Sequence, residues 1–156
     1  MLLKKLTLVF FTLLALSGCM SLAPVTDEAP PLQPGYGIYA IALDTVEDIN
    51  SLFVSGKQNF VIKWPPVGKT LYLYQVPAGE YCIREAHIKN YVVTFRKGSN
   101  AKGFCTYVEA DTINYSGHIF LRANSQFIQD YSHFVRLMAR KYPKLCREFI
   151  GDACEK

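Results

Sequence analysis

The sequence lacks an apolar run long enough to cross a membrane as a helix. Its longest apolar stretch, residues 6–16, is interrupted by two threonines, whereas a spanning helix needs about 20 apolar residues. Two lysines precede this stretch, and the small residues Ser17 and Gly18 follow it. This arrangement predicts a secretory signal peptide over residues 1–18.

The signal ends in Leu16-Ser17-Gly18-Cys19, which resembles a bacterial lipobox. The resemblance implies that Cys19 carries lipid, begins the mature chain and attaches it to the membrane. An ordinary signal cleaved near Gly18, leaving Cys19 as a free thiol, and a membrane-anchor helix are the alternatives. Because Met20 rather than Asp follows Cys19, the sorting rule of lipoproteins implies the bacterial outer membrane, with the domain facing the periplasm.

A large excess of positive charge is also absent. The chain has 17 basic and 13 acidic residues, and the signal contains two of the basic ones, so 15 against 13 leaves the mature chain at +2. Nucleic-acid-binding domains are typically much more basic. We therefore expect no nucleic-acid partner.

No Cys-x-x-Cys pair occurs, so the cysteines match no zinc motif, and we expect no metal site. Without Cys19, four cysteines remain, an even number that predicts disulfides in an exported chain. Cys82 and Cys105 fall in neighbouring predicted strands, and Cys146 and Cys154 flank a short loop. Pairing Cys82 with Cys105 and Cys146 with Cys154 joins cysteines that are already expected to be close together. This connectivity is therefore favoured over the two others.

The mature chain begins with a proline-containing segment, residues 19–34, that has few large apolar side chains. This composition predicts a flexible, extended tether after the lipidated cysteine. Residues 35–156 are a normal length for one domain.

Short stretches of β-branched and aromatic residues follow one another at close spacing from residue 36 to residue 121, separated by turn residues. In the last of them, Gly117 shares a face with large side chains, where a glycine usually makes room for a neighbouring ring. Apolar residues then recur at three- and four-residue steps, which predicts an amphipathic helix over about 125–142, capped by Asn124 or Ser125. The order favours a mainly β fold, an antiparallel β-sandwich or small barrel with one C-terminal α-helix.

Two segments, residues 76–81 (Val-Pro-Ala-Gly-Glu-Tyr) and residues 108–117, resemble strand pairs of small uncharacterised bacterial outer-membrane lipoproteins. That resemblance covers roughly residues 36–122 and implies a transthyretin-like or immunoglobulin-like β-sandwich. Asp111 stands where the family often has glycine at a turn. The family has no established catalytic residues to carry over.

No group of residues converges on a catalytic motif. His87, His118 and His133 are far apart in the sequence and match no zinc spacing. Asp130, His133 and Ser116 permit a Ser-His-Asp set, but Ser116 lies in a strand pattern without a nucleophile elbow. We expect no enzyme activity and no cofactor.

The second half of the predicted helix and the residues after it form a basic run: from Arg136 to Arg147 the sequence contains no acidic residue. The candidates for contact with an anionic surface are Arg136, Arg140, Lys144 and Arg147. The residues expected to bury the opposite face against the sheet are Phe127, Tyr131, Phe134 and Met138. The basic run is typical of a solvated helix face near a C-terminus, or of a contact with anionic lipid or an acidic envelope protein.

These observations favour an outer-membrane lipoprotein that is a non-enzymatic binding or structural module of the cell envelope. An inhibitor of a secreted host enzyme such as lysozyme is the alternative. An exposed loop with an acidic or serine-rich tip would favour it, and Ser99-Asn100 offers slight support.

Overall fold

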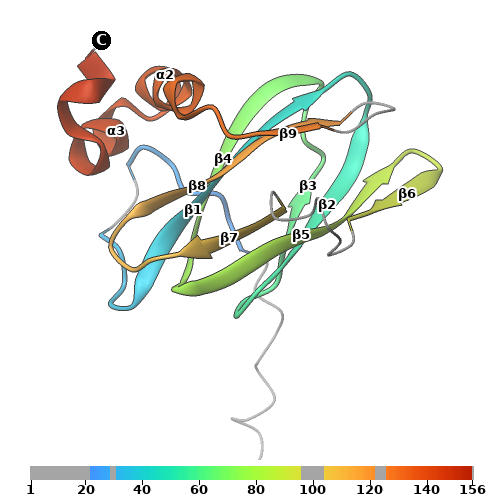
Figure 1. Cartoon of the computed structure of the whole chain (residues 1–156), viewed down its shortest axis with the longest axis horizontal. Helices are drawn as coiled ribbons and strands as arrows, with labels where there is room; N and C mark the ends of the chain where they lie inside the picture. Colours follow the sequence, from blue (N-terminus) through green and yellow to red (C-terminus); the bar gives the residue numbers. More distant parts are fainter. Residues whose placement is uncertain (1–21, 29–30, 96–103, 122–125, 156) are drawn as a thin grey trace, which may run out of the picture.

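Two β-sheets pack against each other in the computed structural model, and two short helices cover the outer face of the first sheet (Figure 1). The structure describes residues 22–28, 31–95, 104–121 and 126–155. Of the two predicted architectures, the β-sandwich is confirmed. The side chains between the two sheets form one core, and those between the first sheet and the helices form a second.

The first sheet has four strands in spatial order β4, β1, β8 and β9. They are β4 (Gly68–Pro77), β1 (Tyr36–Thr45), β8 (Ile113–Leu121) and β9 (Gln126–Ile128). One pairing departs from the antiparallel expectation, because β1 and β8 run parallel. Parallel neighbours need a long connection, and the whole second sheet lies between these two strands in the sequence.

The second sheet is ordered β3, β2, β5 and β6, and β7 also pairs with β5. Its strands are β3 (Phe60–Lys63), β2 (Ile49–Ser55), β5 (Gly79–Ile88), β6 (Tyr91–Thr94) and β7 (Cys105–Val108). The hairpin of β2 and β3 agrees with the apolar runs on either side of residues 55–59.

Strand β1 is buried on both faces, as its nearly continuous apolar sequence indicates. Tyr39 and Ile41 face the core between the sheets. Ala40 and Ala42 face the helices. This strand therefore joins the two cores.

The C-terminal region differs from the single predicted helix. It contains β9, then α2 (Tyr131–Lys141), α3 (Pro143–Phe149) and the 3-10 helix η3 (Gly151–Glu155). The start predicted near 125 is wrong because residues 126–128 pair with β8; Asn124 and Ser125 lie outside the described residues. Asp130 caps α2 instead. Tyr142 lies between α2 and α3, and Pro143, which has no N–H, is the first residue of α3.

Gly117 makes room for a ring, as predicted. Its φ is 133°, and a Cβ atom there would lie 2.2 Å from the Cζ atom of Phe127. Phe127 therefore packs from β9 against β8. Its spacing from the later apolar residues matches a helix, but Phe127 is not part of one.

Both favoured disulfides are confirmed. Cys82 and Cys105 are register partners on β5 and β7. Cys146 on α3 is bonded to Cys154 on η3. The first bond links two strands, and the second holds the C-terminal turn against the helices.

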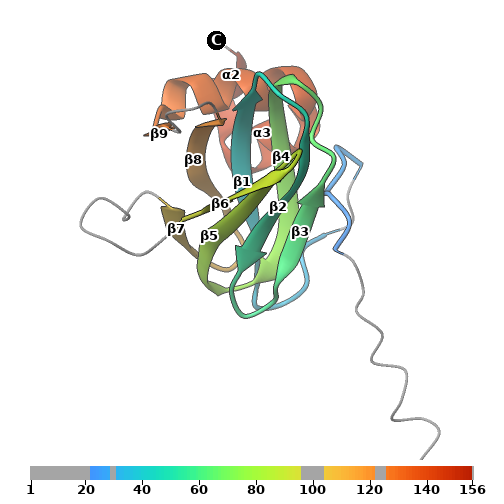
Figure 2. The same cartoon turned by 90° about the vertical axis from the view of Figure 1, so that its right-hand side faces the viewer.

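Part of the predicted tether is hydrogen-bonded to the folded domain. The Val25 N–H donates to the Leu73 carbonyl on the outer edge of β4, at 2.7 Å. The Asp27 carboxylate accepts from the Lys144 N–H at 2.9 Å, at the start of α3. Figure 2 shows this N-terminal segment beside β3 and β4, at the right. Val25 and Asp27 are therefore held against the fold, whereas the flexibility of the tether as a whole stays a prediction.

Candidate functional site

Helix α2 is positioned by its cap and by its buried face. The Asp130 carboxylate accepts from the His133 N–H at 2.9 Å and from the Ser132 hydroxyl at 2.7 Å. These hydrogen bonds stabilise the charged form and lower the pKa of Asp130. Phe134 and Met138 are buried against the first sheet. The outward side of the helix is thereby fixed.

A hollow of about 450 Å³ lies along α2, and its lining is rich in positive charge. Lys69 from β4 borders it together with Arg136 and Arg140 from α2, and all three side chains are exposed. Within the described part of the chain, none of the three forms an ion pair with an acid. Three cations around one hollow attract anionic groups such as phosphate or carboxylate.

The apolar part of this lining comes from α2 and η3. It consists of Val135, Leu137, Ala139, Ala153 and Cys154. Since Cys154 is bonded to Cys146, the second disulfide fixes this wall of the hollow. Arginines beside an apolar surface suit a ligand that has both a charged group and an apolar part.

The structure brings together only two of the four basic residues named from the sequence. Arg136 and Arg140 line the hollow. The Lys144 ammonium forms an ion pair with Glu28, which offsets its charge. Arg147 is exposed on α3 and is not part of the lining. Contact of all four residues with an anionic surface stays a prediction. Lys69, which the sequence did not indicate, lines the hollow with Arg136 and Arg140.

The expected buried face of the helix is correct for Phe134 and Met138 and wrong for the other two residues. Tyr131 is 58 % exposed. Phe127 belongs to β9. Leu137, which was not named, completes the buried face of α2.

Two histidines that are distant in sequence stack beside the hollow. The ring of His118 on β8 lies 5.0 Å from the ring of His133, with an angle of 10° between the planes. Phe120 stacks on His118 at 4.4 Å. Among the described residues, the Nε2 atoms of both histidines are buried without a hydrogen-bond partner.

Burial is the main cause that lowers the pKa of His118. The nearby His133 and Lys69 lower this pKa further, and Asp44 and Asp130 act in the opposite direction. His118 is therefore neutral near pH 7, and its protonation is unfavourable in the folded protein.

Acidification should destabilise the domain through His118. An unfolded histidine has a pKa of about 6.5, so below that pH the unfolded chain binds a proton that the folded chain disfavours. The free energy of unfolding should fall as the pH drops through this value. Denaturant titrations at pH 7.5 and pH 5.5 measure the effect.

A His118→Phe variant, which keeps a stacking ring, should lose part of this pH dependence. His87→Gln is the control, because His87 is half exposed and bound to Glu85. An identical pH dependence in wild type and His118→Phe would contradict the role given to His118.

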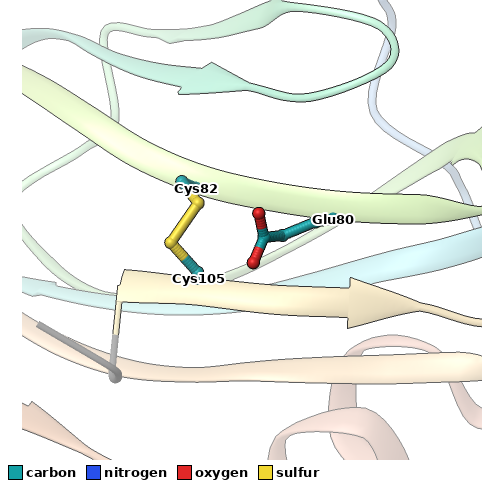
Figure 3. Close-up of side chains that lie close together, drawn as sticks. All are labelled: Glu80, Cys82 and Cys105. Carbon is teal, nitrogen blue, oxygen red and sulfur yellow. A yellow bond between two sulfur atoms is a disulfide. The ribbon is translucent and has the colours of Figure 1, made fainter. Parts of the chain in front are cut away.

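Other predicted sites do not assemble. Ser116 is buried and accepts a hydrogen bond from the Tyr39 hydroxyl at 3.0 Å, so the Ser-His-Asp set does not form. Glu80, Cys82 and Cys105 lie within metal-ligand distance of one another (Figure 3). Since the two sulfur atoms are bonded to each other, this group offers no thiolate in the oxidised protein.

Cys19 lies outside the described residues, as does the loop with Ser99 and Asn100. No helix in the described part of the chain has the length and apolar character needed to cross a membrane. No family model, curated protein or solved structure matches this chain.

Proposed function

We propose that this chain is a lipid-anchored protein of the bacterial outer membrane whose β-sandwich is a non-enzymatic binding module of the cell envelope. The signal-like residues before Cys19 support the anchor. The two disulfides support export, because such bonds persist in oxidising compartments.

The observation that carries the binding function is the cationic hollow formed by Lys69, Arg136 and Arg140. A protein attached to a membrane by lipid stays within reach of anionic head groups. Each basic residue near such a surface contributes about 1 kcal/mol of attraction, and salt screens it over about a Debye length. The hollow is therefore proposed to contact anionic lipid or an acidic envelope partner.

Binding of the unlipidated mature chain to anionic vesicles tests this function. The double variant Arg136→Gln with Arg140→Gln should bind roughly thirty-fold more weakly, from about 1 kcal/mol per residue. Cosedimentation at low and high salt measures the difference.

The matched control is Lys57→Gln with Arg147→Gln, which removes the same charge from exposed positions outside the hollow. The control should bind nearly as well as wild type. Equal loss in the two double variants would show that net charge alone drives binding and would overturn the role of the hollow.

A further inference from the structure

Trp64 is the only tryptophan of the chain, and the fold holds it outward. Its side chain is 71 % exposed, and its backbone has a φ of 50°. Bulky residues avoid this left-handed conformation, and a strained residue that persists often marks a functional position.

The loop around Trp64 is held by specific bonds. The Trp64 N–H donates to the Asn50 carbonyl at 3.0 Å. The Thr45 hydroxyl donates to the Pro66 carbonyl at 3.1 Å. Val67 in this loop is 56 % exposed, and Val46 in the preceding turn is 50 % exposed. The exposed apolar groups are thus presented by a fixed backbone.

Residues 64–67 connect β3 to β4, which are edge strands of the two different sheets. The N-terminal segment lies on the same side of the sandwich, because Val25 bonds to the outer edge of β4. In Figure 2 the segment, β3 and β4 share the right-hand side.

The length of chain between the fold and Cys19 limits how far the proposed lipid can lie from the domain. Leu22 is half-buried against the inner core, and only Met20 and Ser21 separate it from Cys19. Three extended residues reach about 10 Å. A lipid on Cys19 would therefore hold Leu22, at the start of the segment that runs beside β3 and β4 in Figure 2, within that distance of the head groups.

Exposed cations flank the loop on this side, whereas the acids of the N-terminal segment, Asp27 and Glu28, are bound to Lys144 at α3. Lys63 and Lys69 are exposed on either side of the loop. The acids of the preceding turn are Glu47, which pairs with Lys89, and the exposed Asp48. Tryptophan flanked by lysine is typical of the interface between membrane and water, where the ring meets apolar chains and the N–H meets polar groups.

We infer that the side formed by β3, β4 and residues 64–67 faces the bilayer, with Trp64 in the head-group layer. The inference uses the proposed lipid anchor for its distance argument. It adds an orientation for the domain and a second, aromatic contact that the lipid alone would not supply.

The sole tryptophan makes this contact measurable in the otherwise unaltered protein. The mature chain from Cys19 is coupled through the Cys19 thiol to a maleimide lipid in vesicles, since the other four cysteines are in disulfides. Trp64 emission should shift to shorter wavelength, and brominated lipids should remove a large part of it.

The matched control moves the tryptophan to the far edge of the second sheet. It combines Trp64→Phe with Tyr107→Trp, because Tyr107 on β7 is 66 % exposed. Its emission should resist the brominated lipids. Quenching that is equal at the two positions, or greater at position 107, would overturn the inferred orientation.

Chemical coupling separates this inference from the proposed function. Attachment to the vesicle does not require natural acylation, so the quenching result stands whether or not Cys19 is lipidated in the cell. The mass of the natural N-terminal peptide reports acylation independently.

Discussion

A Cys19→Ala variant should be lost from washed membranes. Acyl chains contribute about 0.8 kcal/mol per buried CH₂, and stable attachment takes more than one chain or a second signal. Among the described residues, no helix is long and apolar enough to span a membrane. The variant keeps the cationic hollow and Trp64, but these contacts are expected to be weak and, in part, sensitive to salt.

Flotation of membranes after a high-salt wash measures this loss. Met20→Ala is the control, because it changes the neighbouring residue and keeps the thiol. An intact-mass measurement shows whether the leader has been removed from each protein. A cleaved Cys19→Ala protein that floats with membranes at the wild-type level would refute the anchor.

Phe134→Asp should unfold the domain or detach α2. Phe134 is 1 % exposed, and its ring stacks on Tyr115 at 4.4 Å. Truncating a buried phenylalanine to alanine costs about 3–5 kcal/mol, and an unpaired buried carboxylate adds a further penalty. The whole stability of a domain is only about 5–15 kcal/mol, so the loss should be large.

Thermal unfolding followed by near-UV circular dichroism checks this result. Tyr131→Asp is the control on the same helix, three residues earlier, and should have little effect because Tyr131 is mostly exposed. An unchanged melting temperature for Phe134→Asp would show that the buried face of α2 is assigned wrongly.

Local sequence patterns were sufficient for the strands, the turn residues and the two disulfides. They failed at residues 126–128 because the spacing from Phe127 to Tyr131 imitates a helix, while the pairing with β8 determines the actual structure. A short strand is stabilised by hydrogen bonds to a partner strand elsewhere in the chain. The local spacing of apolar residues does not indicate that partner. Asp111 adopts a φ of 59°, the left-handed conformation that turns use and that Asp adopts more readily than most residues.

The site was predictable only where it lies on one helix. Arg136 and Arg140 are four residues apart, so the sequence places them side by side. Lys69 joins them because β4 passes under α2, a contact between segments about seventy residues apart. The stacking of His118 on His133 and the binding of Asp27 at α3 were also not predictable, because each joins elements that only the tertiary fold brings together.

The mass of the N-terminal peptide of the protein purified from its native envelope tests the proposed anchor most directly. An acylated Cys19 as the first residue is the predicted result. A chain that begins at another residue, or at Cys19 with an unmodified thiol, would contradict it.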